Sequence, residues 1–507
     1  MNHCKLHLVL FNLGILLFVR CAWSPALFHA YSPVQELQKD LDSLFSDPSF
    51  SSAFWGVAVQ SLHTGEYLYL HNEHKLFVPG SNVKLFTTAA ALLTLGPDYR
   101  FKTTLAYKGQ IMDSVLTGDL FLQGAGDPTL YSDAFSDSTK GIFECFADSL
   151  QSLGIRSFDG HIIGDDSAFE DERWGVGWSW DYLDREYAAP IGALALHENC
   201  FEVLICPGDS VGALAVVHVN PDAEACALIN RVVTSDSPGI SQIRIHRPLY
   251  GEEAYLEGHI CAGAEPVIKK IAVTDPTRFF VSCFHHYIKQ KLVFQERIQD
   301  SRDQEISVAA PDSVSRVSSY LSPPLWQIIR VVNQQSQNLY AELLLRAIAH
   351  HAGETGSALN GIKIMKKTIA QLGIDSTEAM LVDGSGLSRK NTVTPLSITS
   401  LLRVMRSQTA YYLSLPVAGV DGTLEARMTD AAAYGNVRAK TGTLDQVKAL
   451  SGYVLTADKE ELVFAILINH FTASTESVNA TQDAVCNRLA IFSRSAKHRD
   501  DAGSWRN

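Results

Sequence analysis

One stretch of the chain restricts the fold more than any other: a helix without a polar face. Residues 82–95 follow a Pro-Gly-Ser sequence at 79–81 and contain three alanines and two leucines in a row at 89–93. Alanine and leucine are strong helix formers, so the segment is predicted to be helical. Because a helix that is apolar on all sides must be buried, the rest of the chain has to surround it.

Elements on both sides of this helix indicate what surrounds it. Alternating residues at 56–61 and 66–70 predict a β-hairpin just before it. Much later in the chain, helices are predicted at 325–333, 339–351 and 361–372, strands at 437–441, 449–456 and 462–469, and a last helix at 481–492. This order suits an α/β (α+β) domain with one antiparallel sheet that is built from both ends of the chain and covered by helices.

Between these two sets of elements the sequence changes character. Short strands and turns dominate residues 111–310, with similar strand starts at 116–120 and 158–162. We therefore predict a single catalytic domain, with parts at 31–110 and 311–495, that is split by strand-rich inserted domains at 111–310. A chain of 507 residues has room for about three domains at roughly 150 residues each.

The charge of the chain argues against two classes of partner. The sequence has 42 Lys and Arg against 55 Asp and Glu, a formal net charge of -13. No broad basic surface is therefore expected that could follow a phosphate backbone, which excludes nucleic acid and anionic membrane faces as partners. An anionic ligand would have to bind through a few local residues.

Both ends of the chain are expected to lie outside the folded domains. Lys5 precedes an apolar run at 6–19 that is shorter than the roughly 20 residues needed to span a bilayer, so 1–30 is interpreted as a secretory signal peptide. A lipid anchor at Cys21 and an uncleaved anchor are the alternatives. Residues 496–507 form a polar tail. These features predict an exported protein, periplasmic or extracytoplasmic.

The cysteines and histidines do not predict a metal site. None of the cysteines forms a C-x-x-C pair, and the histidine pairs at 285–286 and 350–351 have no other ligands near them in the sequence. We therefore expect neither a metal nor another cofactor. Cys200 and Cys206 are candidates for a disulfide in an oxidising compartment, but their pairing stays open.

The apolar helix begins with a chemically suggestive pair. Ser81 and Lys84 form the one S-x-x-K tetrad of the chain, and residues three apart lie on one face of a helix. A lysine desolvated beside an apolar helix can lose its proton and serve as the base that activates a serine nucleophile. On its own, the tetrad also describes a serine N-cap followed by a surface lysine.

A second motif lies on a predicted strand near the end of the chain. Lys440-Thr441-Gly442 is the one K-T-G and is followed by Thr443. A glycine there would let a ligand approach the strand backbone closely, Lys440 would supply a positive charge, and the two threonine hydroxyls would bind a carboxylate.

A third motif completes an ordered set. Ser336 and Asn338 form an S-x-N between two predicted helices, where both side chains are free to point into a cleft. A second S-x-N at 477–479 follows the K-T-G, so only Ser336 preserves the order S-x-x-K, S-x-N, K-T-G. That order is the signature of penicillin-interacting serine enzymes.

With these motifs the sequence resembles the class C low-molecular-mass penicillin-binding proteins, the D-alanyl-D-alanine carboxypeptidase/endopeptidase family. The likeness extends from about Ser43 to Phe492 and includes segments at 95–101, 124–130, 164–169, 199–200, 382–389 and 415–424. The long insertion after the first motif is typical of that family. The resemblance implies a penicillin-binding, serine β-lactamase-like catalytic domain split by a large two-domain insertion.

The resemblance also implies a role for each motif residue. Ser81 would be acylated by the penultimate D-Ala carbonyl of a peptidoglycan stem peptide, with Lys84 as its base. Ser336 would pass a proton to the leaving D-Ala, assisted by Lys440. The remaining roles concern binding: Asn338 would orient the substrate amide, Thr441 would hold the terminal carboxylate, and the backbone N–H groups of Ser81 and Thr443 would form an oxyanion hole. β-Lactam antibiotics would acylate the same serine.

Recognition of the substrate side chain rests on the resemblance alone. Asp165 and Arg389 match the family positions that bind the free end of a diaminopimelate side chain. Asp445 stands where relatives carry a neutral polar residue, and this additional carboxylate would favour a substrate amine. The preferred third residue of the stem peptide stays open.

Two other functions fit part of this pattern. A serine β-lactamase uses the same motifs but needs a fast deacylation base, and none is identified here. An inactive wall-binding protein of the same fold would tolerate loss of Ser81, Lys84, Ser336 or Lys440, and all four are present. The sequence leaves open the oligomeric state and whether carboxypeptidase action or cleavage of the D-Ala to diaminopimelate cross-link dominates.

Overall fold

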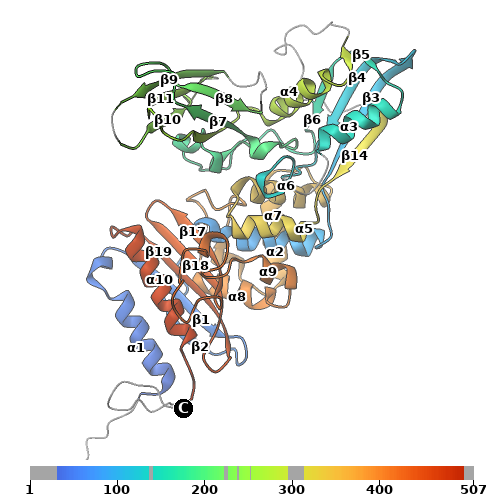
Figure 1. Ribbon diagram of the computed structural model, residues 1–507. Helices are drawn as coiled ribbons and strands as arrows, with labels where there is room; N and C mark the ends of the chain where they lie inside the picture. The colour runs from blue at the N-terminus through green and yellow to red at the C-terminus, as the bar shows by residue number, and fades with distance from the viewer. Residues whose placement is uncertain are drawn as a thin grey trace, which may run out of the picture.

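The fold consists of a helix-covered sheet and a strand-rich insertion that extends from it (Figure 1). This computed structural model describes residues 31–135, 141–221, 227–236, 239–249, 251, 253–294 and 313–495. The predicted signal peptide at 1–30 and the predicted tail at 496–507 lie outside the described residues. No helix of the described part is long and apolar enough to cross a bilayer.

One antiparallel sheet of five strands, in the order β17-β18-β19-β1-β2, joins the two ends of the chain. Its early strands are β1 (Phe54–Ser61) and β2 (Tyr67–His71), and its late strands are β17 (Arg438–Leu444), β18 (Val447–Leu455) and β19 (Glu461–Asn469). β1 pairs with β19 along its whole length, from Phe54 opposite Asn469 to Ser61 opposite Leu462. The predicted sheet built from both chain ends is therefore confirmed.

Helices cover both faces of this sheet. On one face lies α2 (Val83–Leu95), in which Val83 to Leu92 are all buried, as an apolar helix requires. It is enclosed by α5 (Leu325–Gln334), α6 (Asn338–His351), α7 (Ala358–Gln371), α8 (Pro395–Met405) and α9 (Thr409–Ser414). α1 (Pro33–Phe45) and α10 (Thr475–Ala490) cover the other face (Figure 1).

The first helix was missed in the sequence, although its signals are present there. Ser32 and Gln35 form a capping box at its start, and its buried side chains Leu37, Leu41 and Phe45 are spaced four residues apart. This spacing is the pattern of an amphipathic helix. α10 likewise begins at Thr475, six residues before the predicted start at 481.

The insertion contains three sheets that share one continuous apolar core. The largest sheet has the order β13-β5-β4-β3-β14, with β6 also paired to β4. Its strands are β3 (Lys102–Met112), β4 (Val115–Gln123), β5 (Ser157–Asp159), β6 (Ile162–Asp165), β13 (Val293–Phe294) and β14 (Ser315–Leu321). Two helices that were not predicted, α3 (Ile142–Ser152) and α4 (Pro276–Lys289), supply apolar side chains to the same core.

The other two sheets have three strands each, in the orders β12-β7-β8 and β10-β11-β9. Their strands are β7 (Cys200–Cys206), β8 (Val216–Asn220), β9 (Leu228–Ser235), β10 (Gln242–His246), β11 (Ala254–Cys261) and β12 (Val267–Ala272). Cys200 and Cys206 are free thiols at opposite ends of β7. Six residues of extended strand separate them by roughly 20 Å, too far for a disulfide.

The predicted ends of the insertion, at 111 and 310, need correction. β3 begins at Lys102 and pairs with β14, from Leu321 opposite Lys102 to Ser315 opposite Tyr107. Both strands belong to the largest sheet of the insertion. A boundary at 111 would divide β3 between the two domains, and a boundary at 310 would assign β14 to the catalytic domain. We therefore propose that the insertion extends from about 102 to 321.

Candidate active site

Ser81 lies at the junction between the central helix and the sheet. The 3-10 turn η2 (Gly80–Asn82) runs directly into α2, so Ser81 stands half-buried at the N-terminal end of that helix. The buried Asn82 side chain donates a hydrogen bond of 2.8 Å to Ser451 Oγ on β18. The turn that carries Ser81 is thus attached to the sheet.

Three glycines allow the turn at Ser81 to pack closely. Gly80 has a φ of +52°, and Gly386 a φ of +85°. A Cβ atom on Gly386 would lie 2.0 Å from the Gly80 carbonyl oxygen, and one on Gly442 would lie 2.4 Å from the Pro79 carbonyl oxygen. Gly442 was predicted to admit a ligand. In the structure it admits the chain's own turn instead, because that turn fills the space beside β17.

Lys84 donates hydrogen bonds to three groups at and around Ser81. Its side chain has no exposed surface. Lys84 Nζ donates to Ser81 Oγ at 3.0 Å, to Asn338 Oδ1 at 2.6 Å and to the Ser385 carbonyl oxygen at 2.6 Å. The S-x-x-K and S-x-N motifs, whose Lys84 and Asn338 are 254 residues apart, therefore meet at one ammonium group.

Burial lowers the pKa of Lys84 to about 7, although the negative charges of Asp383 and Glu342 act in the opposite direction. A low dielectric disfavours the charged form of an amine. Near neutral pH, a substantial fraction of Lys84 is therefore the uncharged free base. A lysine at the surface would be almost entirely charged at this pH.

A loop formed by residues 383–388 encloses Lys84 from the other side. Two buried carboxylates hold this loop through its backbone. Glu342 accepts from the N–H groups of Gly384 and Ser385 at 3.0 and 2.8 Å. Asp383 accepts from the N–H groups of Gly386 and Ser388 at 2.8 and 2.7 Å. The loop is thereby shaped so that the Ser385 carbonyl faces Lys84.

These two carboxylates are themselves buried. Burial, and then the negative charge of Glu342, raise the pKa of Asp383 to about 6. Glu342 also pairs with the fully buried Arg346, whose Nη1 lies 3.1 Å from Glu342 Oε2. Neither carboxylate was identified in the sequence, although Asp383 lies in the 382–389 segment noted there for its resemblance. Glu342 lies on α6, four residues after Asn338, and gives no separate signal.

The second serine–lysine pair forms the opposite side of the site. Ser336 stands just before α6 with a φ of +61°, in the left-handed region that a serine seldom adopts. Lys440 on β17 donates to Ser336 Oγ and to the Thr441 carbonyl oxygen, both at 2.9 Å. Strained backbone of this kind is often found at functional sites.

Lys440 is fully buried, and no carboxylate contributes to its titration. Burial, followed by repulsion from Lys84, lowers the pKa of Lys440 well below its usual value. An anionic group brought by a ligand would favour the charged form again. The site is therefore built to receive a negative charge next to Lys440.

The insertion also contributes to the site. Asn338 Nδ2 donates to the Tyr187 carbonyl oxygen at 2.7 Å, and Trp178 Nε1 donates to Asp383 Oδ2 at 3.0 Å. Gln337, the middle residue of the S-x-N, donates to Glu198 Oε2 at 2.8 Å. Glu198 is the centre of three successive residues with positive φ, at 197–199. Contacts from three parts of the insertion thus hold the catalytic motifs in place.

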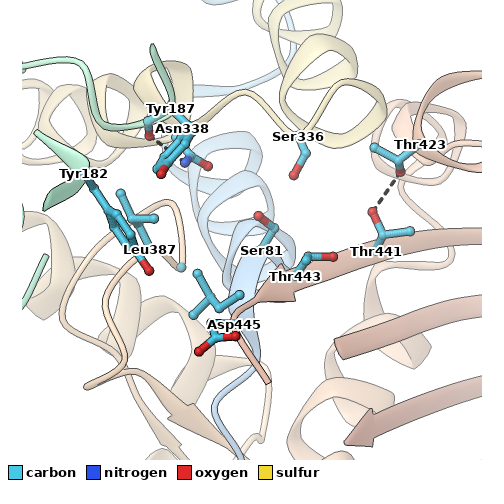
Figure 2. A pocket seen from close by; sticks show the side chains of 12 residues that line it. Ser81, Tyr182, Tyr187, Ser336, Asn338, Leu387, Thr423, Thr441, Thr443 and Asp445 are labelled. Carbon is cyan, nitrogen blue, oxygen red and sulfur yellow. Dashed lines mark hydrogen bonds between the residues drawn. The ribbon is translucent and has the colours of Figure 1, made fainter. Parts of the chain in front are cut away.

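A cavity of about 440 Å³ opens between these groups (Figure 2). Ser81 lies near its middle, with Ser336 on one side and the threonines of β17 on another. It is lined by Ser81, Tyr182, Tyr187, Ser336, Asn338, Gly386, Leu387, Thr423, Thr441, Thr443, Leu444 and Asp445. Tyr182 and Tyr187 were not identified in the sequence, whereas Leu387 and Thr423 lie in segments noted there for their resemblance but were given no role.

The two residues predicted to bind a substrate side chain behave differently. Asp165 does not line the cavity. It is buried at the end of β6, where it accepts from Gln123 Nε2 at 3.1 Å and from Ser167 Oγ at 2.6 Å. Each carboxylate oxygen of Asp165 thus accepts from a neighbouring side chain, and its role in binding a substrate side chain stays a prediction. Arg389 is exposed and donates to the backbone carbonyl of Asp445, a residue that lines the cavity.

No metal site accompanies this cavity among the residues that the structure describes. They include no group of three or more His, Cys, Asp or Glu side chains placed to hold an ion.

Comparison with known proteins connects this geometry to a family. The pattern of the D-Ala-D-Ala carboxypeptidase 3 (S13) family matches residues 37–490. The chain is 32% identical over 491 residues to the D-alanyl-D-alanine carboxypeptidase of Actinomadura sp. (strain R39), covering 92% of this chain and 87% of the relative. It is 25% identical over 424 residues to D-alanyl-D-alanine carboxypeptidase DacB of Haemophilus influenzae, covering 82% of this chain and 85% of the relative.

A solved structure is similar over nearly the same extent. Penicillin binding protein 4 (dacB) from Haemophilus influenzae matches with a TM-score of 0.73 at 24% identity, covering 89% of this chain and 98% of that chain. The match supports the fold described above, a sheet and helices of the penicillin-binding, β-lactamase-like type with additional domains.

The close packing at Ser81 leads to a first prediction. Gly386→Ala should lower the rate at which fluorescent penicillin acylates Ser81 by at least about tenfold, because the new Cβ displaces the Gly80 carbonyl and with it Ser81. Gly373→Ala is the matched control. Gly373 has a φ of +78° with nothing within 4 Å of its would-be Cβ. In both variants the positive φ destabilises the fold by about 1 to 2 kcal/mol, but only Gly386→Ala also introduces a steric clash.

The measurement is the second-order rate constant of labelling, with melting temperatures to confirm folding. Equal labelling of the two variants would contradict the role given to the Gly386 contact.

Proposed function

Because the chain belongs to the D-Ala-D-Ala carboxypeptidase 3 (S13) family and is a serine-type D-Ala-D-Ala carboxypeptidase, we propose that Ser81 is its nucleophile. The observation that carries this assignment is the hydrogen bond of 3.0 Å from the fully buried Lys84 Nζ to Ser81 Oγ. Ser336 also contacts a lysine, but Ser81 stands at the N-terminal end of the buried helix α2, where backbone N–H groups stabilise negative charge.

Lys84 is suited to act as the base because its hydrogen bonds survive the loss of a proton. The Asn338 and Ser385 oxygens can only accept, whereas the Ser81 hydroxyl can either accept or donate. In the free base, two N–H groups still serve the two oxygens, and the lone pair faces Ser81. The Ser81 proton then passes to Lys84 as Ser81 Oγ attacks the substrate carbonyl carbon.

The negative charge that develops on the substrate oxygen needs donors. β17 is an edge strand, so alternate backbone N–H groups along it point away from β18. The backbone nitrogen of Thr443 lies 3.0 Å from the point that a Cβ atom on Gly80 would occupy. The backbone nitrogen of Ser81 lies 3.1 Å from the point that a Cβ atom on Gly386 would occupy. We assign these two N–H groups to the oxyanion hole, where one donor stabilises the transition state by roughly 3 to 4 kcal/mol.

Departure of the amine completes acylation. When the C–N bond breaks, the leaving nitrogen takes a proton from Ser336 Oγ, and Ser336 recovers one from Lys440, which donates to it at 2.9 Å. Water then attacks the ester carbonyl, Ser81 Oγ leaves with the proton held by Lys84, and the proton released by the new carboxylic acid recharges Lys440, while the other proton of the water passes to solvent. Asn338, whose Oδ1 accepts from Lys84, has one remaining N–H to orient the substrate amide.

The substrate proposed is the D-Ala-D-Ala end of a peptidoglycan stem peptide. The terminal carboxylate would lie against the hydroxyls of Thr441 and Thr443, which line the cavity beside Lys440. β-Lactams carry a carboxylate next to a reactive carbonyl and would acylate Ser81 in the same way. Cleavage of the D-Ala to diaminopimelate cross-link stays a prediction, which the products of a cross-linked muropeptide would decide.

We also propose that the protein acts outside the cytoplasm. The apolar run at 6–19 after Lys5 supports this, as does the location of peptidoglycan itself. Expressed at full length, the exported protein should lose about 30 residues, and mass spectrometry of the mature chain checks this. A mature chain that retains Met1 would contradict a cleaved signal.

The pH dependence of acylation follows from Lys84. Because the free base is required, the second-order rate constant should rise with pH along an acidic limb with a midpoint near 7, falling about tenfold for each unit below it. Protonation of Asp383, with its pKa raised to about 6, should steepen the profile further below that point. A limb centred near the ordinary lysine pKa of about 10.4 would contradict the assignment of Lys84 as the base.

The covalent intermediate is the direct test of the nucleophile. Labelled penicillin should attach to the unmodified protein and not to Ser81→Ala, and the adduct should persist because no fast deacylation base is identified.

Ser336→Ala should lower release of D-Ala from a D-Ala-D-Ala pentapeptide by about 100-fold or more. Ser477→Ala, at the exposed serine of the second S-x-N, is the matched control and should leave the rate unchanged.

Two results would contradict this proposal. The first is a stable label on Ser81→Ala, and the second is rapid turnover of penicillin by the unmodified protein.

A further inference from the structure

Lys448 is a cation that the proposed mechanism does not use, yet it lies directly behind the substrate-binding strand. It stands on β18 opposite Thr443 of β17, and only 9% of its surface is exposed. Its Nζ donates to Thr443 Oγ1 at 3.0 Å. It forms no ion pair within the described part of the chain.

None of the charged neighbours of Lys448 in the described part of the chain forms an ion pair with it. Arg427 repels it, and the guanidinium of Arg427 already pairs with Asp483 at 2.6 Å. Glu476, which attracts it, is a fully exposed residue at the start of α10. A buried cation without a partner carbonyl or carboxylate is costly unless a ligand completes its environment.

The hydrogen bond to Thr443 fixes how that hydroxyl can be used. Because Thr443 Oγ1 accepts from Lys448, its own proton has to point elsewhere. Thr443 lines the cavity, as does Thr441, two residues earlier on the same face of β17. The geometry therefore leaves the Thr443 proton available to a ligand oxygen in the cavity.

We propose that Lys448 is a specificity-determining residue that favours a carboxylate at Thr441 and Thr443. It orients the Thr443 hydroxyl as a donor and places a positive charge one hydroxyl group behind the bound anion. The inference rests on the proposed function, since it concerns the terminal carboxylate of the same substrate. Lys440 already donates to Ser336 and the Thr441 carbonyl, so the charge of Lys448 would add to that of Lys440 at the bound carboxylate.

The test compares two ligands that differ only in this charge, penicillin and its methyl ester. The rate constant of Ser81 acylation by each is measured for the unmodified protein, Lys448→Met, Lys448→Gln and Lys448→Arg. Lys448→Met should react with the free acid roughly tenfold more slowly and with the ester less than about twofold more slowly, given the attraction between nearby unit charges at a protein surface.

The other two variants separate charge from hydrogen bonding and from stability. Lys448→Gln retains a donor for Thr443 without a charge and should resemble Lys448→Met, whereas Lys448→Arg should keep the acid-to-ester ratio within about threefold. Melting temperatures identify any variant that fails to fold, and the remaining variants then decide.

The outcomes distinguish this inference from the proposal on which it rests. An equal fall with both ligands, or no fall with either, would overturn the role of Lys448 and leave the nucleophile assignment intact. Absence of any acylation of the unmodified protein would overturn both. A selective loss with the free acid that Lys448→Arg restores would support Lys448 as the carboxylate-selecting charge.

Discussion

The burial of the Lys84 ammonium is the interaction on which the rest of the site depends. An amine without exposed surface needs three acceptors, and it finds them in Ser81, Asn338 and Ser385. Each acceptor comes from a different part of the chain, so the start of the apolar helix, the start of α6 and the 383–388 loop must all be packed before the lysine is satisfied. The same burial lowers the pKa of Lys84 to about 7, which makes it a base.

Carboxylates placed away from the cavity support this arrangement. Glu342 and Asp383 accept backbone N–H groups of the 383–388 loop, and their negative charges oppose part of the shift in Lys84. They therefore both shape the loop and limit how far the pKa of the base falls. Trp178 of the insertion donates to Asp383, which makes the insertion part of the catalytic structure and more than an attachment to it.

The sequence predicted the residues that have a motif and missed those that act through folding. Ser81, Lys84, Ser336, Asn338 and Lys440 were identifiable because each belongs to an ordered short pattern, and the structure brings all of them together. Glu342 was missed because no motif distinguishes this glutamate from any other glutamate in a helix. Asp165 was assigned from the family resemblance alone; its oxygens accept from Gln123 and Ser167, and its role stays a prediction. Gly442 was predicted to face a ligand, and it faces Pro79 instead.

By itself, the sequence determined that a buried helix begins with Ser81 and Lys84, and that strands from both ends of the chain form the surrounding sheet. Periodicity and motif order carry this information because they depend on local spacing. Only the tertiary structure decided which distant groups satisfy Lys84, that β3 pairs with β14, and that Lys448 lies behind Thr443. The reason is that hydrogen-bond partners and the burial that shifts a pKa arise from contacts between segments far apart in the chain.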